Sequence, residues 1–241
     1  MYSDIIYVLN VIGNRWCIGM GGQEYLVKSL NIGKIEMYTY GKKVYQSAIK
    51  KQPIEGSVYL SKVGLVGDEQ AYEFHGGENK ALCLYPYDYY DYWRPNFKNM
   101  VGTALFGENL TVIGLTEDKA HIGDIFSFGE AIIQISEPRN PCYKLAAKYE
   151  MPNLIKQVRN NGYTGFLLRV LKEGMVSAND RMILIEPHPQ KVSVALVNDV
   201  KFQDCFNAEK VNRVLQVEEL SKSLRDAIKK QFESGKKNGW G

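Results

Sequence analysis

The stretch DIFSFGEAIIQIS, residues 124–136, contains two short runs of β-branched and aromatic residues on either side of a Gly-Glu pair. Runs of this kind are typical of strands, and the connection between Phe128 and Ala131 is typical of a hairpin. Similar runs, separated by glycine and polar turns, recur at 33–40, 44–49, 57–60, 81–85, 109–113, 165–171 and 181–186. Strands at this spacing predict a mainly β domain, either a sandwich or a barrel.

Helical patterns interrupt and then follow the strands. Pro86 is expected to be the first helical residue of 85–93, and Pro152 to open a helix that ends at Asn161-Gly162. After Pro187-His188-Pro189 the chain turns helical. Helices are predicted over 194–202, over 208–215 with Asn207 as N-cap, and over 222–232 with Ser221 as N-cap. Helices this short bury little alone, so we expect a small bundle beside the β domain.

The chain of 241 residues is long enough for one large domain with a small appendage. Its net charge of +3 is too small to indicate nucleic acid as the main partner. The apolar run 5–12 is too short for a membrane helix and lacks a basic region before it, so no membrane partner is expected. The predicted parts are an extension (1–28), the β domain (29–188), a three-helix domain (189–235) and a tail (236–241).

The four cysteines are widely spaced and only three histidines are present, so neither a structural zinc site nor a disulfide scaffold is expected. This usage favours a reducing, cytoplasmic compartment. Cys83 lies in an apolar run and Cys205 in a helical pattern, which places both in the core. Cys142 is then the one cysteine whose sequence neighbours suggest a reactive or metal-binding thiol.

Cys142 lies in SEPRNPCYKL, residues 136–145, between Arg139 and Lys144. Neighbouring positive charge favours the thiolate, which is the form that binds metals and attacks substrates. Pro138 and Pro141 restrict this turn, so it is expected to hold the thiol outward. From these residues alone, a chemical thiol and a proline-bounded connection with an incidental cysteine are equally supported.

Other polar groups could contribute to a site. His75 precedes the paired glycines Gly76 and Gly77, which let backbone amides approach an anion, although a plain tight turn explains them better. Asn109 follows a glycine and a carboxylate where a strand begins. A nucleophilic pair of Cys142 with His75 or His121 is also open.

Five segments in order resemble the MOSC domain, a family named for the C-terminal domain of molybdenum cofactor sulfurase. They are GLVGDEQ (64–70), HGGENKALC (75–83), FGENL (106–110), IGD (122–124) and PRNPCYKL (138–145). The pattern is most similar to the bacterial branch linked to hydroxylaminopurine resistance, which carries a three-helix domain after the MOSC domain. The resemblance extends from about residue 32 to residue 232.

The resemblance implies a β-barrel-like fold that binds the molybdenum cofactor, Mo-molybdopterin, a pterin dithiolene with a terminal phosphate. Cys142 matches the family's cysteine and would be both the metal ligand and a catalytic residue, and a soft thiolate suits a sulfur-rich centre. We place His75 and Asn109 beside the metal or substrate. Side chains and backbone amides expected to bind the phosphate and pterin are those of Arg139, Lys144, Lys50, Lys51, Arg169, Gly76 and Gly77.

The implied activity is two-electron reduction of a small N-hydroxylated base, with its oxygen leaving as water. The cysteines lack cluster spacing and no flavin or haem motif is visible, so a separate reductase would donate the electrons. The aromatic segment 85–93 could stack a purine-like base, but its helical pattern favours core packing. A non-catalytic cofactor carrier or sulfur-handling protein, a Cys/His hydrolase or transferase, and a homodimer are left open.

Overall fold

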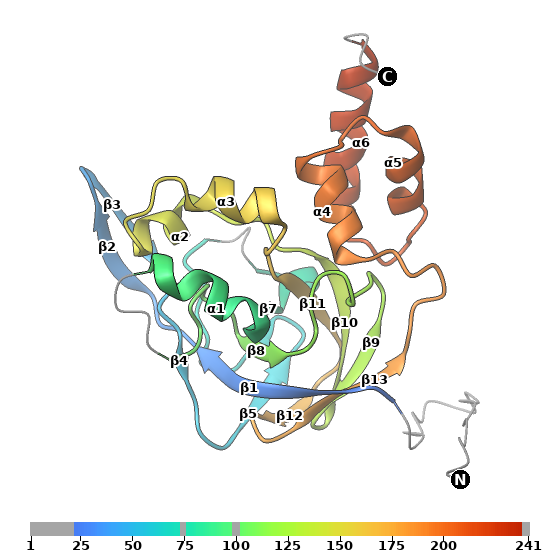
Figure 1. Ribbon diagram of the computed structural model, residues 1–241. Helices are drawn as coiled ribbons and strands as arrows, with labels where there is room; N and C mark the ends of the chain where they lie inside the picture. The colour runs from blue at the N-terminus through green and yellow to red at the C-terminus, as the bar shows by residue number, and fades with distance from the viewer. Residues whose placement is uncertain (1–21, 73–75, 98–101, 238–241) are drawn as a thin grey trace.

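The computed structural model describes residues 22–72, 76–97 and 102–237 of the chain. Seven strands form a closed barrel in the order β13-β9-β10-β11-β7-β8-β1, because β13 also pairs with β1 (Figure 1). They are β1 (Glu24–Ile32), β7 (Leu82–Pro86), β8 (Leu110–Ile113), β9 (Ile125–Phe128), β10 (Ala131–Pro138), β11 (Phe166–Lys172) and β13 (Arg181–Glu186). The predicted mainly β class is confirmed, and of the two alternatives the barrel is correct.

The remaining strands lie outside this closed sheet. β4 (Gln52–Pro53) extends the sheet beyond β1. A three-stranded sheet joins β12 (Gly174–Ser177), β5 (Ser57–Ser61) and β6 (Gly64–Leu65), and a hairpin joins β2 (Glu36–Tyr40) to β3 (Lys43–Ser47). In Figure 1 this hairpin extends beside α2.

The hairpin of the opening stretch is present, with Ala131 opposite Phe128 in the register of β9 and β10. Every residue of β10 is buried, because the barrel interior covers one face of the strand. On the other side the strand contacts the helix α4 (Val194–Phe202) and the 3-10 turn η2 (Glu78–Lys80).

Three short helices cover one end of the barrel: α1 (Tyr90–Trp93), α2 (Tyr143–Lys148) and α3 (Leu154–Asn161). They enclose a second hydrophobic core that contains Tyr85, Tyr90 and Trp93. The preference of the 85–93 aromatics for core packing is thus confirmed for these three fully buried side chains, whereas Tyr92 is exposed.

The predicted three-helix domain is present as α4, α5 (Ala208–Leu215) and α6 (Lys222–Lys237). The Asn207 and Ser221 side chains accept hydrogen bonds from the backbone N–H groups of Lys210 and Leu224, as expected of N-caps. Apolar side chains of all three helices belong to the same core cluster as the barrel interior. No helix in the described ranges is both long and apolar enough to span a membrane.

Several predicted boundaries were wrong. The barrel begins at Glu24, within the predicted extension, because Tyr25 and Val27 alternate into the core and β1 pairs with β13 from its first residue. Pro86 ends β7 and is followed by the 3-10 turn η3 (Tyr87–Tyr89), so it does not open a helix. α6 continues to Lys237, into the predicted tail.

Candidate functional site

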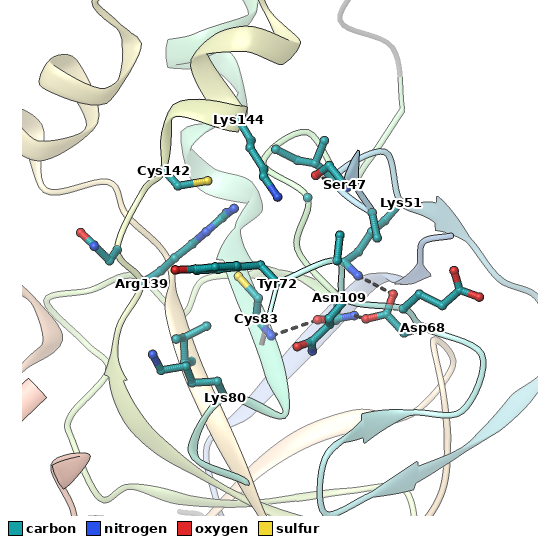
Figure 2. A pocket seen from close by; sticks show the side chains of 18 of the residues that line it. Ser47, Lys51, Asp68, Tyr72, Lys80, Cys83, Asn109, Arg139, Cys142 and Lys144 are labelled. Carbon is teal, nitrogen blue, oxygen red and sulfur yellow. Dashed lines mark hydrogen bonds and ion pairs between the residues drawn. The ribbon is translucent and has the colours of Figure 1, made fainter. Parts of the chain in front are cut away.

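A pocket of about 340 Å³ lies where the ends of the barrel strands meet α2 (Figure 2). Its chemically notable side chains come from five separate segments of the chain, and the fold alone brings them together. They are Lys51, Asp68, Tyr72, Lys80, Cys83, Asn109, Glu137, Arg139, Cys142 and Lys144.

Cys142 lines the pocket as the residue immediately before α2. Its extended backbone ends the turn after β10, and its side chain makes no capping hydrogen bond. The thiol is partly exposed, as the proline-rich turn predicted. Its sulfur is directed into the pocket in Figure 2.

Arg139 follows β10 and reaches into the same pocket. Its Nη1 is buried and has no hydrogen-bond partner among the described residues. Burial opposes the protonated form, but the negative charges that Cys83, Cys142 and Glu108 carry when ionised outweigh it and raise the pKa of Arg139. A charged donor that the protein leaves unsatisfied is suited to an anionic ligand.

Cys83 also lines this pocket, from strand β7. The prediction that it is a plain core residue was wrong, because alternation along a strand cannot distinguish a core-facing position from a pocket-facing one. Burial raises the pKa of the Cys83 thiol despite the opposing charge of Arg139. Cys83 is therefore a neutral thiol at neutral pH, unlike the anion that a metal requires.

Asn109 and Lys51 line the pocket through a fixed hydrogen-bond network centred on Asp68. The Asn109 amide donates to Asp68 Oδ2 at 2.8 Å and to the Asn31 carbonyl at 3.2 Å, and its oxygen accepts from the Cys83 N–H at 3.1 Å. Lys51 forms an ion pair with Asp68. These hydrogen bonds make Asn109 a brace between strands. It also lines the pocket, where it was expected, and its contact with metal or substrate stays a prediction.

The cations of the pocket differ in how they are paired. Lys80 Nζ lies 3.4 Å from the Glu137 carboxylate. Lys144 Nζ donates to the Gln46 carbonyl at 2.8 Å, which links α2 to the β2–β3 hairpin. Of the lining cations, Arg139 and Lys144 form no ion pair within the described ranges, and both flank Cys142.

Four of the expected cofactor-binding residues do not line the pocket. Arg169 donates to Asn79, to Gln134 and to the Glu219 carbonyl at 2.7–2.9 Å, so it joins the barrel to the helical domain. Lys50 lies 4.8 Å from the centroid of the Tyr38 ring, on the outer surface.

Gly76 and Gly77 have structural roles instead. A Cβ at Gly76 would lie 1.8 Å from the Gln70 side chain, and Gly77 has a φ of 96° before η2. His121 bonds Asp124 and lies outside the pocket, so it cannot pair with Cys142. The prediction for His75 lies outside the described residues.

Tyr72 and Lys80 also line the pocket, although neither was predicted as a site residue. Lys80 could have been suspected, since it lies within the HGGENKALC segment. Tyr72 stands in no recognisable motif, and only the folded chain places it in the same pocket as Cys83 and Arg139.

No cluster of three or more His, Cys, Asp or Glu side chains suited to a metal ion occurs in the described part of the chain. The described part of the pocket can therefore offer a metal the sulfur of Cys142, together with cationic groups for an anion. A soft sulfur ligand beside two cationic side chains, Arg139 and Lys144, suits an anionic, sulfur-rich metal cofactor that brings its remaining ligands itself.

The fold is that of a known class. Residues 71–183 match the MOSC domain, and residues 192–235 match the YiiM-like, 3-alpha helix domain. The chain thus belongs to the MOSC family, in the group of YiiM-like proteins that carry the three-helix domain.

Individual relatives agree with this assignment. The chain is 39% identical over 213 residues to the uncharacterized protein YflK of Bacillus subtilis, covering 88% of this chain and 96% of that one. It is 38% identical to protein YiiM of Escherichia coli, covering 85% and 91%. The crystal structure of YiiM from Geobacillus stearothermophilus matches with a TM-score of 0.74 and 33% identity, covering 86% and 99%.

A fungal protein from Gibberella moniliformis, named a reductase, is 35% identical over 163 residues. The matched region is 66% of this chain but 29% of that protein.

Proposed function

We propose that this protein binds the molybdenum cofactor in the Cys142 pocket and reduces N-hydroxylated nucleobases, such as hydroxylaminopurine, to their amines. The net reaction, R–NHOH + 2e⁻ + 2H⁺ → R–NH₂ + H₂O, breaks the N–O bond and releases the oxygen as water. When bound, the cofactor supplies the metal centre that carries the two electrons, which come from a separate reductase.

The observation that carries the proposal is the buried Nη1 of Arg139, for which the described part of the chain provides no hydrogen-bond partner. An unsatisfied buried donor costs free energy, and a bound anion would satisfy it. Lys144 would add positive charge on the same side, and the Cys142 sulfur would hold the molybdenum. Asn140 and Tyr72 are exposed at the pocket, so water can reach it and supply the protons. The name of the Gibberella relative supports a redox role.

The test begins with protein purified from a host that makes the cofactor. Molybdenum content, pterin fluorescence and reduction of 6-hydroxylaminopurine by an artificial electron donor are measured for the wild type, Cys142→Ala and Cys83→Ala. Cys83→Ala is the matched control, since it removes a thiol of the same pocket that is held neutral.

We expect Cys142→Ala to lose molybdenum and turnover, and Cys83→Ala to keep both. Equal metal content and turnover in Cys142→Ala and wild type would overturn the ligand assignment. Cofactor retained by the wild type without any turnover would favour the non-catalytic carrier.

A further inference from the structure

Among the described residues that line the pocket, Tyr72 is the one with an aromatic side chain. Its side chain is 49% exposed. In Figure 2 the ring lies across the middle of the pocket, among the labelled side chains of Arg139, Cys83 and Lys80. A large ring exposed inside a pocket contributes little to the core, so its position suits contact with a ligand.

The other apolar residues of the pocket cannot offer a comparable surface. Ala48, Ile49 and Leu167 are each no more than 9% exposed, and the half-buried Ala71 offers only a methyl group. Most of the remaining lining side chains are charged or polar. The face of Tyr72 is therefore the main apolar surface that a ligand would meet.

The aromatic residues of the 85–93 segment cannot take this role. Tyr85 is fully buried and stacks on Phe106 with ring centroids 4.0 Å apart. Trp93 is also fully buried and stacks on Phe97. A base has no access to either ring face, so core packing accounts for them.

We infer that Tyr72 stacks against a flat heteroaromatic ring of the substrate, so that the pocket prefers N-hydroxylated bases to small aliphatic N-hydroxylated compounds. This inference rests on the proposed function. The lining amides of Gln70 and Asn140 can meet the polar edge of such a ring. Arg139 and Lys144 are left to bind the anionic cofactor.

The test uses Tyr72→Phe, which keeps the ring, and Tyr72→Leu, which removes it. Tyr143→Leu is a matched control, because Tyr143 is 53% exposed but lies outside the pocket. For cofactor-loaded protein with an artificial donor, kcat/KM is measured with 6-hydroxylaminopurine and with N-methylhydroxylamine. Binding of adenine, a flat ring that cannot be reduced, is measured by calorimetry.

We expect Tyr72→Leu to lower kcat/KM for 6-hydroxylaminopurine and to weaken adenine binding by roughly 5- to 100-fold, as for a lost base-stacking contact. Turnover of N-methylhydroxylamine should be unchanged, and Tyr72→Phe and Tyr143→Leu should behave as wild type. A loss in Tyr72→Phe equal to that in Tyr72→Leu would assign the effect to the hydroxyl and overturn the inference.

Two further outcomes would also overturn it: an equal loss for both substrates, or a loss of pterin from Tyr72→Leu, which would place the ring against the cofactor. A wild type that reduces neither substrate would refute the proposed function. In that case adenine binding that depends on the Tyr72 ring would still support stacking.

Discussion

A buried guanidinium nitrogen without a hydrogen-bond partner lowers the stability of a folded protein, and Arg139 carries one beside two thiols. If this group serves to bind a ligand, removing it should raise the stability of the protein and at the same time abolish ligand binding. We expect Arg139→Met to raise the free energy of unfolding of the cofactor-free protein by about 1–3 kcal/mol, because an unsatisfied buried donor is lost.

The same variant should retain no pterin when it is made in a cofactor-producing host. Thermal unfolding of cofactor-free protein and pterin fluorescence of loaded protein measure the two effects. Since Arg139→Lys keeps a charge but lacks the planar fork, it should retain pterin only weakly. A cofactor-free Arg139→Met protein less stable than the wild type would show that Arg139 has a structural role.

The sequence could predict the pocket residues only where a motif marks them. Cys142, Arg139 and Lys144 lie within one segment that follows β10, and all three line the pocket. Lys50 and Lys51 look equivalent in sequence, yet only Lys51 lines the pocket, where it pairs with Asp68, whereas Lys50 is exposed at a bend and lies over the Tyr38 ring. Spacing alone cannot say which of two neighbouring lysines faces inward.

Glu117 connects several elements away from the pocket. Its Oε1 accepts a hydrogen bond from the Gly165 N–H, beside β11, at 2.7 Å, and its carbonyl accepts one from the Ala195 N–H of α4 at 2.9 Å. Burial raises the pKa of Glu117 to about 7 from 4.5. The folded protein thus keeps a proton that the unfolded chain has released above pH 4.5.

This contribution to stability is complete below about pH 4.5 and is lost as the pH rises to about 7. The loss has a slope of at most about 1.4 kcal/mol per pH unit. Glu117→Gln should reduce the slope of the free energy of unfolding against pH, whereas Glu209→Gln, at an exposed site on α5, should leave it unchanged. Urea unfolding at pH 5 and pH 7.5 measures the difference; an unchanged slope in Glu117→Gln would assign the pH dependence to other groups.

Elements with strong local signals were predicted well. Asn161-Gly162 ends α3, where Gly162 adopts a φ of 75°, and Asn207 caps α5. β1 was missed although Tyr25 and Val27 alternate with Glu24, Leu26 and Lys28, because the residues before it resemble an extension. Its place depends on pairing with β13, more than 150 residues later in the chain, which no local pattern encodes.

At the scale of the whole molecule, the barrel and the three-helix domain share one hydrophobic core. The interface between the two domains also extends to the pocket. The Ser221 hydroxyl at the start of α6 donates a hydrogen bond to the Glu137 carboxylate, which forms an ion pair with Lys80. Arg169 binds the Glu219 carbonyl across the same boundary. The helical domain therefore helps to fix one wall of the pocket, although no single motif in the sequence predicts this.

A shared core predicts that the two domains unfold together. Ile228 of α6 is 2% exposed within that core, so Ile228→Ala should cost about 2–5 kcal/mol, the usual range for a buried isoleucine. Hydrogen exchange measured by mass spectrometry should show the same loss of protection in peptides from α6 and from β10. Lys229→Ala, at the exposed neighbouring position, should change neither peptide. If β10 kept its protection while α6 lost it, the helices would be a separate folding unit, and the wall at Glu137 would have to be held by the barrel alone.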